Sequence, residues 1–139
     1  MNAVDYGYKD AQEYVENTEK NVCRFIQIEH KDLVEDLENV IQNPYIDGYI
    51  FGANDLSGSI GELMNTFGEN TQALIKKSIE ILNKHDKYIG ISIGENDSEI
   101  IEKWHNLGIH MISSNSDFRC IYSKSKETLD NLKKFHLGK

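Results

Sequence analysis

The sequence predicts an α/β fold in which parallel strands are joined by crossover helices. Four short apolar segments with strand character alternate with four helical patterns, and each helical pattern is long enough to connect two parallel strands. At 139 residues, with 39% hydrophobic and 27% charged residues, the chain has the size of one ordinary domain with its own core. We therefore predict a single domain over residues 1–139.

The first half of the chain contains two of the predicted strands. A polar pattern with few apolar residues predicts a short helix over 8–20. The segment "VCRFIQI" (22–28) is typical of a strand, and "KDLVEDLENVIQ" predicts a helix directly after it. A turn built on the only proline, "NPYIDG" (43–48), then leads into the second strand, near 47–51.

The second half repeats this alternation twice. A broad apolar stripe in "TQALIKKSIEILNKH" predicts a long helix after Asn70, and the third strand is predicted over 88–93. A helix over 98–108 should stop at Gly108, and the fourth strand follows near 109–114. A last helix is predicted around "SKETLDNLKKFH".

Two arrangements of four parallel strands are compatible with this pattern. One is a small open doubly wound sheet, and the other is an arc of a (β/α)8 barrel. A complete barrel of that kind takes about 250 residues, so this chain would form roughly half of one.

Composition excludes several classes of partner. The formal net charge of −8 argues against nucleic acid, which requires a basic face. The sequence has no run of 18 apolar residues and no basic-then-apolar segment at its N-terminus, so we expect neither a membrane span nor a secretory signal. The two cysteines, Cys23 and Cys120, form no close-spaced pair, which favours a reducing cytoplasm.

The first strand carries a candidate functional face. Because side chains alternate along a strand, Cys23, Phe25, Gln27 and Glu29 share one side. That side turns from apolar to polar toward the carboxyl end, where the sites of parallel α/β folds lie. Glu29 is thus either a ligand or a solvated residue at the end of a strand.

Asp55 lies at the corresponding end of the second strand. Alone, it would be interpreted as a helix N-cap. Because adjacent strands lie about 4.8 Å apart, however, Glu29 and Asp55 can converge above the sheet. Two converging carboxylates repel each other unless a cation or proton lies between them. Oxygen ligands with open positions for water suit Mg2+ or Mn2+.

The residues around Asp55 are small, which suits a loop whose backbone approaches a ligand; they are Gly52, Ala53, Ser57, Gly58 and Ser59. The helix that begins near Asp55 would direct free N–H groups toward an anion. A cation beside an anion-binding helix end suits a chelating keto acid. The sequence contains neither GxGxxG nor GxxxxGK[ST], the motifs of dinucleotide and P-loop sites.

Other polar and aromatic residues are weaker candidates. His30 could approach the same rim, but a solvated or capping histidine is the better prediction. The segment 113–116 (SSNS) could line the mouth of the site or cap the final helix, and capping is the better prediction. Trp104 should pack in the core. The remaining histidines have no spacing typical of a zinc site; they are His85, His105, His110 and His136.

Two motifs in this chain resemble a known family. "FIQIEH", ending just after Glu29, and "GANDLSGSIG", in which Asp55 follows Glu29 by 26 positions, are similar to the paired metal motifs of the HpcH/HpaI aldolase and citrate lyase family. These are class II pyruvate aldolases related to the phosphoenolpyruvate mutase and pyruvate kinase-like superfamily. The resemblance extends from about residue 8 to the C-terminus, including "GIHMISSNSD". It implies the C-terminal half of a (β/α)8 TIM barrel.

The resemblance also implies a function. Glu29 and Asp55 would ligate Mg2+ or Mn2+, Gln27 would face the bound keto acid, and the backbone of Gly52, Ala53, Asn54 and Asp55 would receive its carboxylate. The activity implied is that of a carbon–carbon lyase, a reversible retro-aldol cleavage of 2-keto acids that releases pyruvate through a metal-stabilised enolate.

The chain departs from the family pattern at three points. Ala53 stands where proline is usual, and His30 where a small hydroxyl residue is common. The family's catalytic histidine base and its enolate-stabilising arginine belong to the first half of the barrel; Arg24 and Arg119 do not match that arginine, and no histidine here matches the base. The catalytic residues are thus not predicted within this chain.

These departures leave the partner and the role of the chain open. The predicted partners are a separate N-terminal half-barrel chain or further copies of this chain, because a four-strand arc leaves two open edges. In the family, subunits exchange their last helix, so "SKETLDNLKKFHLGK" could reach a neighbour. The alternatives to an aldolase are a non-catalytic or truncated remnant acting as an oligomerising module, and an unrelated flavodoxin-type ligand-binding domain.

Overall fold

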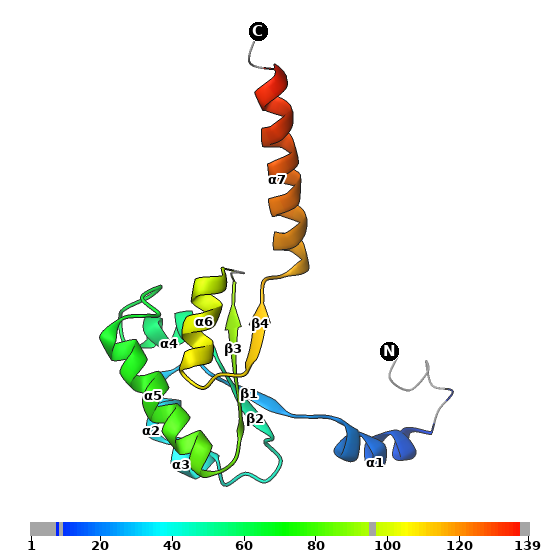
Figure 1. The fold of residues 1–139 in the computed structure, drawn as a ribbon. Helices are drawn as coiled ribbons and strands as arrows, with labels where there is room; N and C mark the ends of the chain where they lie inside the picture. The colour runs from blue at the N-terminus through cyan, green and yellow to red at the C-terminus, as the bar shows by residue number, and fades with distance from the viewer. Residues whose placement is uncertain (1–7, 9, 95–96, 137–139) are drawn as a thin grey trace.

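The computed structural model describes residue 8, residues 10–94 and residues 97–136. The N-terminal residues in which we predicted no secretory signal, and the last three residues of the predicted domain, lie outside these ranges. The described residues form one parallel sheet with the strand order β1-β2-β3-β4 (Figure 1). The four strands are β1 (Phe25–Ile28), β2 (Gly48–Phe51), β3 (Tyr88–Ile93) and β4 (Met111–Ser114).

Helices precede, connect and follow the strands, as the sequence predicts. They are α1 (Ala11–Asn21), α2 (Lys31–Glu35), α3 (Leu37–Val40), α4 (Ala53–Ser59), α5 (Glu69–Lys84), α6 (Ser98–Asn106) and α7 (Asp117–His136). Two differ from the prediction. The helix expected after the first strand is divided at Asp36, which ends α2 and begins α3, and the final helix starts earlier than its apolar pattern indicates. Gly108 follows α6 with φ +91°, the left-handed conformation expected of a terminating glycine.

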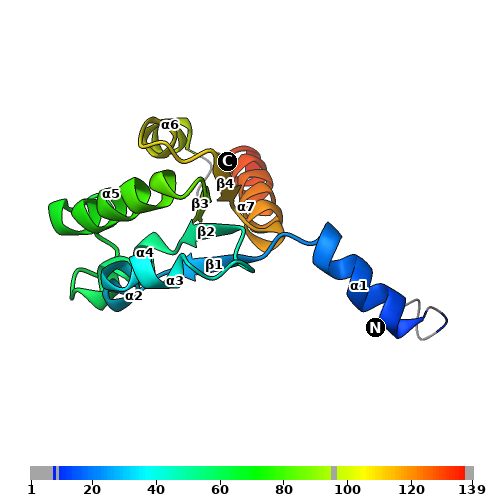
Figure 2. The same ribbon diagram turned by 90° about the horizontal axis from the view of Figure 1, so that it is seen from below.

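One face of the sheet carries the hydrophobic core. Ile28, Phe51 and Ile91 are in register across three strands and are fully buried. They belong to one cluster with helical residues that include Leu56, Leu82 and Trp104. We call this the covered face; Figure 2 shows α2 to α6 together on this side of the strands.

Strand order and helix placement decide between the two predicted arrangements. A doubly wound sheet reverses its strand order at a switch point and carries helices on both faces. Here the strands follow one another in chain order, and α2 to α6 lie on one side (Figure 2). The fold is therefore an arc of a (β/α)8 barrel.

The opposite face of the sheet, which would line the barrel interior, is largely uncovered. We call it the open face; by register and alternation it carries Phe25, Gln27, Gly48, Ile50, Gly52, Tyr88, Gly90, Ser92, Met111 and Ser113. Phe25 and Tyr88 approach each other with ring centroids 6.5 Å apart, and Tyr88 is 66% exposed. A cavity of about 440 Å³ lies at the amino end of this face, bordered by Phe25, Tyr88 and Met111.

The first and last helices extend away from the sheet. In Figure 1, α1 projects from the start of β1 and α7 from the end of β4, and both helices point away from the strands. The apolar residues of α7 are exposed; they are Phe118, Ile121, Tyr122, Leu129, Leu132 and Phe135. Within the described residues, no helix combines the length and the apolarity needed to cross a membrane.

Candidate functional site

The two predicted metal ligands follow neighbouring strands at the carboxyl end of the sheet. Glu29 comes directly after β1, and Gly52, which opens the segment containing Asp55, comes directly after β2. The ladder extends one step beyond β2, because the Gly52 N–H donates to the Ile28 carbonyl at 3.0 Å. This hydrogen bond fixes the position of the segment after β2, along the strand direction, relative to Glu29.

Both carboxylates converge on the space above Gly52. A Cβ atom added to Gly52 would lie 3.3 Å from Oε2 of Glu29 and 3.6 Å from Oδ2 of Asp55. It would also lie 3.1 Å from the Cβ of Glu29. Glycine therefore leaves open a small space that two oxygens from different strands border. The convergence predicted from strand spacing is present.

Asp55 does not cap the helix, which corrects the interpretation that its sequence context alone favours. The helix α4 begins at Ala53, and its N-cap is Gly52, with no side-chain capping hydrogen bond. Asp55 is the third helical residue and is exposed. Its carboxylate is held in the first turn, where the helix dipole favours a negative charge. That charge also remains available to a ligand.

The pair fits a hard divalent cation that retains other oxygen ligands. Mg2+ is commonly held by one or two carboxylates together with water and substrate oxygens. No cluster of three or more His, Cys, Asp or Glu side chains capable of holding a metal occurs in the described part of the chain. The chemistry of the donors, two carboxylates beside an open space, therefore suits Mg2+ or Mn2+ better than zinc, whose structural sites use four nitrogen or sulfur ligands.

The backbone beside the pair can receive an anion. Ala53, Asn54 and Asp55 are the first three residues of α4, so their N–H groups have no partner within the helix. The Gly52 N–H is already engaged by Ile28. Above Gly52 there is thus open space, while the next three amides have no partner within the helix.

Gln27 lies on the open face two residues before Glu29. It is exposed, whereas the next residue, Ile28, points to the covered face and is fully buried. The register places Gln27 beside Ile50 of β2, one pleat below the carboxylates. The alternation predicted for this strand is confirmed, and the Gln27 side chain points to the side on which the carboxylates converge.

Three of the structural roles predicted for other residues are confirmed. His30 caps α2, since its Nδ1 accepts a hydrogen bond from the Asp32 N–H at 3.3 Å. Trp104 is buried in the core with 1% of its surface exposed. Ser116 caps the final helix by accepting from the Arg119 N–H at 3.2 Å.

The structure also reveals a contact that the sequence does not predict. A cavity of about 80 Å³ lies between α4, β3 and α6, and its lining includes Asn54, Ser92 and Trp104. Phe67, in the loop between α4 and α5, also lines this cavity and stacks on Trp104 with ring centroids 4.6 Å apart. Nothing in the local sequence pattern pairs the two rings, because they meet only through the packing of α6 beside that loop.

Comparison with known proteins points to aldolases. No model of a protein family matches the chain. Among curated proteins, a 5-keto-4-deoxy-D-glucarate aldolase of Klebsiella pneumoniae is 27% identical over 123 residues, covering 88% of this chain and 47% of that protein. A hydroxypyruvate/pyruvate aldolase of Roseobacter denitrificans is 29% identical over 85 residues, covering 61% of this chain and 33% of that protein.

Solved structures agree on the fold. An HpcH/HpaI aldolase from Desulfitobacterium hafniense superimposes with a TM-score of 0.76 at 20% identity, covering 93% of this chain and 49% of that one. An HpcH/HpaI aldolase/citrate lyase family protein from Burkholderia cenocepacia gives 0.78 at 16% identity, covering 91% and 49%.

The chain resembles half of an HpcH/HpaI aldolase. The resemblance predicted from the two motifs is thereby confirmed, together with the α/β half-barrel architecture. Some of the curated relatives match most of this chain. The chain spans about half the length of these relatives.

Proposed function

We propose that this chain carries the divalent-metal and keto-acid-binding part of an aldolase or lyase that acts on 2-keto acids. The observation that supports it most directly is the convergence of Glu29 and Asp55 above Gly52. The similarity to two curated aldolases supports the same reaction class. The exposed, unpaired thiols of Cys23 and Cys120 agree with the reducing cytoplasm that we propose as its location.

The roles of individual residues follow from their positions. Glu29 and Asp55 would hold Mg2+ or Mn2+, which would act as a Lewis acid toward the 2-keto group of a substrate. The amides of Ala53, Asn54 and Asp55 would donate hydrogen bonds to the substrate carboxylate, and Gln27 would contact the pyruvate moiety from below. Together these groups orient the keto acid with its reacting carbon facing the barrel interior.

Retro-aldol cleavage also needs a base, which takes the proton of the substrate hydroxyl as the carbon–carbon bond breaks into an aldehyde and the enolate of pyruvate; a proton must then be delivered to the enolate carbon to give pyruvate. His30 is the histidine adjacent to Glu29, but its Nδ1 already accepts from the Asp32 amide. We therefore propose that the base and an enolate-stabilising arginine come from a first half-barrel, supplied by another segment or a separate chain. General acid–base help is worth about 10²–10⁴-fold in rate, so this chain alone should bind far better than it turns over.

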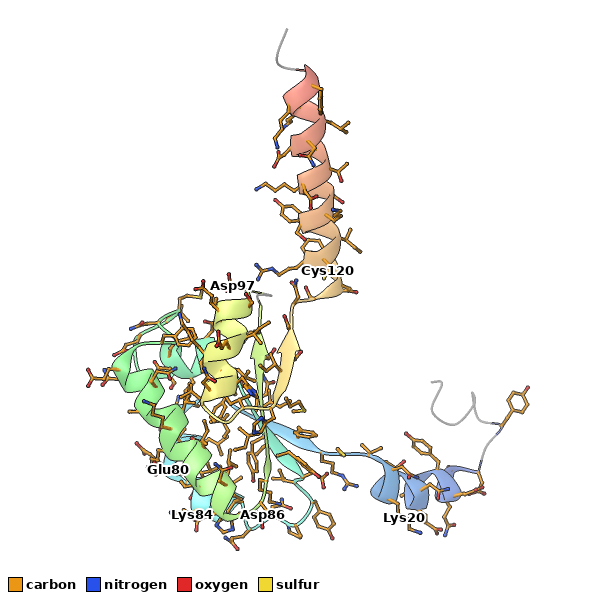
Figure 3. All side chains as sticks on the ribbon, in the orientation of Figure 1. Lys20, Glu80, Lys84, Asp86, Asp97 and Cys120 are labelled. Carbon is orange, nitrogen blue, oxygen red and sulfur yellow. The ribbon has the colours of Figure 1, made fainter. Side chains whose placement is uncertain are left out.

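Manganese titration tests the binding claim. We expect the wild-type chain to bind Mn2+, and Glu29→Gln/Asp55→Asn to bind it more than about 100-fold more weakly, because even groups that only support metal ligands are worth 10–100-fold. The matched control is Glu35→Gln/Glu80→Gln, which also removes two negative charges, but from exposed helical positions away from the pair (Glu80 is labelled in Figure 3). Equal affinity in the wild type and the first double variant would refute the metal site.

Deuterium exchange into the methyl group of pyruvate separates catalysis from binding. With Mn2+ in D2O, we expect little exchange by the chain alone and clear exchange when a first half-barrel is added. The alternative function is a non-catalytic module that associates with other subunits. The exposed apolar residues of α7 and of the open face favour this alternative. That alternative predicts no exchange under either condition.

A further inference from the structure

The sheet ends in two unprotected edges. In the described part of the chain, β1 pairs only with β2 and β4 only with β3, so one side of each outer strand has no neighbouring strand. Neither Phe25–Ile28 nor Met111–Ser114 contains a charged residue or a proline. Natural edge strands use such residues to prevent pairing with another chain. Both edges are therefore suited to pair with a further parallel strand.

The amino end of the open face is a preformed apolar surface. Phe25 and Met111, from the two outer strands, extend inward over glycines of the inner strands: a Cβ atom at Gly48 would collide with the Phe25 ring, and one at Gly90 with Cε of Met111. Together with Tyr88 they border the cavity of about 440 Å³. Tyr88 and Met111 remain 66% and 37% exposed, so this surface is accessible to a partner.

The chain exposes more surface than a compact monomer of its size. Its accessible surface is 10053 Å², whereas a compact monomer of 15.9 kDa exposes about 7,400 Å². The projecting helices α1 and α7 account for part of this difference (Figure 1). A standard protein–protein interface buries about 800 Å² on each partner. The difference is therefore large enough for a stable dimer.

The first helix also indicates where a partner lies. α1 has 11 residues, with Tyr14 and Val15 39% and 60% exposed, and isolated helices shorter than about 12–15 residues are marginal in water. In a (β/α)8 barrel the helices form a ring outside the strands. Because α1 precedes β1, closure of the barrel would place it outside β1 and the strand that becomes its neighbour. If that strand is β4 of a second copy, α1 covers Ile112, which is only partly buried.

We propose that two copies of this chain close one eight-strand barrel around a two-fold axis that runs along the barrel. Four parallel strands in chain order form half of such a barrel, and the rotation supplies the other half. β4 of each copy then pairs in parallel with β1 of the other, and the two open faces form a shared interior. This inference goes beyond the proposed function, since it requires neither metal nor substrate. A first half-barrel would occupy the same surface in place of the second copy.

The distribution of polar residues along the open face favours this symmetry over a face-to-face stack. Phe25 and Tyr88 lie at the amino end, whereas Glu29, Ser92 and Ser113 lie at the carboxyl end. A two-fold axis along the barrel brings the apolar ends of both copies together and keeps the polar ends together. An antiparallel stack would press the carboxylate of each copy against the aromatic end of the other, and burial of an unpaired charge is costly.

The mass of the chain in solution tests the association. EDTA is present so that no metal contributes, and the full-length chain is measured by light scattering after size exclusion. We expect twice the chain mass of 15.9 kDa. Tyr88→Asp/Met111→Asp places two charges on the open face and should reduce the mass to that of one chain. Circular dichroism and urea unfolding at low protein concentration check that this variant is folded, since neither side chain is buried in the single chain.

Two control variants localise the interface. Leu63→Asp/Met64→Asp introduces the same two charges at positions 68% and 72% exposed, in the loop between α4 and α5, and should keep the double mass. Ile121→Asp/Leu132→Asp changes exposed apolar residues of α7 and should also keep it. The second control separates association through the open face from association through the last helix.

Hydrogen exchange distinguishes a closed barrel from any other dimer. In the wild type, the amides on the outer edges of β1 and β4 should exchange more slowly than in Tyr88→Asp/Met111→Asp, because they donate to the strand of the second copy. A stack of two faces would leave both edges exposed to water. Residue-resolved exchange by NMR measures the difference.

The outcomes separate this inference from the proposed function. A wild-type mass of one chain would overturn the barrel and leave the proposed metal site standing. A dimer that survives Tyr88→Asp/Met111→Asp, or that Ile121→Asp/Leu132→Asp abolishes, would also overturn it, as would a dimer whose edge amides exchange as fast as those of the single chain. A wild-type dimer that behaves as expected but binds no Mn2+ would refute the proposed function alone.

Discussion

The two faces of the sheet differ in what their side chains do. On the covered face, Ile28, Phe51 and Ile91 are fully buried beneath helices. On the open face, Tyr88 is 66% exposed, and Glu29 and Asp55 converge above a glycine. The covered face therefore contributes most of the folding free energy, whereas the open face holds the candidate chemistry. Substitutions on the covered face should therefore change the stability of the fold, and substitutions on the open face should change ligand binding, each with little effect on the other.

The largest expected effect is on the covered face. Phe51→Ala should destabilise the chain by about 3–5 kcal/mol, because it removes a fully buried ring and leaves a cavity. Tyr88→Ala on the open face should cost less than about 1 kcal/mol, as exposed positions generally do. Urea unfolding at low protein concentration measures both. A cost at Tyr88 as large as that at Phe51 would mean that the open face is buried in solution.

The next effect is confined to the carboxylate pair. Gly52→Ala places a methyl group between Glu29 and Asp55, so Mn2+ affinity should fall about 10–100-fold while stability changes little. Gly58→Ala, in the same helix, is the matched control: the added Cβ would meet only Leu63, and Mn2+ affinity should not change. Retention of full affinity by Gly52→Ala would show that the cation does not lie above Gly52.

A smaller effect is expected from the buried hydroxyl of Tyr49. This residue is fully buried, and its hydroxyl has no hydrogen-bond partner among the described residues. Replacing it by Phe removes an unsatisfied polar group, so Tyr49→Phe should be neutral or stabilising by up to about 1 kcal/mol at pH 7.

The same substitution predicts a pH dependence. Burial raises the pKa of Tyr49 above its ordinary value of 10.0, so the unfolded chain ionises first. The native state then holds more protons than the unfolded state, and the wild type should lose stability as the pH rises above about 10. Tyr49→Phe should lose less. Urea unfolding at neutral and alkaline pH compares the two, and identical losses would contradict this assignment.

The smallest effect concerns His30, the exposed N-cap of α2. Because its ring nitrogen caps the helix, His30→Ala should cost about 0.5 kcal/mol, and His30→Ser should recover most of that loss. Mn2+ affinity should be unchanged in both variants. A loss of Mn2+ affinity that His30→Ser does not recover would instead assign the ring to the metal site.

Local patterns predicted much of the fold and of the candidate site. The four strands, the helices between them and the capping roles of His30 and Ser116 were all predicted, because alternation and capping depend on neighbouring residues. The division of the helix at Asp36 was missed, because one apolar stripe continues through both pieces. Residue type alone would make Asp55 a cap, yet the N-cap of α4 is Gly52, and Asp55 is the third residue of the helix.

By itself, the sequence determined the parallel α/β alternation and which residues of each strand share a face, since both follow from periodicity and connection length. Only the tertiary structure decided that α2 to α6 lie on one side, that Gly52 opens a space between two carboxylates, and that Phe25 and Met111 extend over glycines of the inner strands. These are distances between segments far apart in the chain, and packing of the strands and helices sets them.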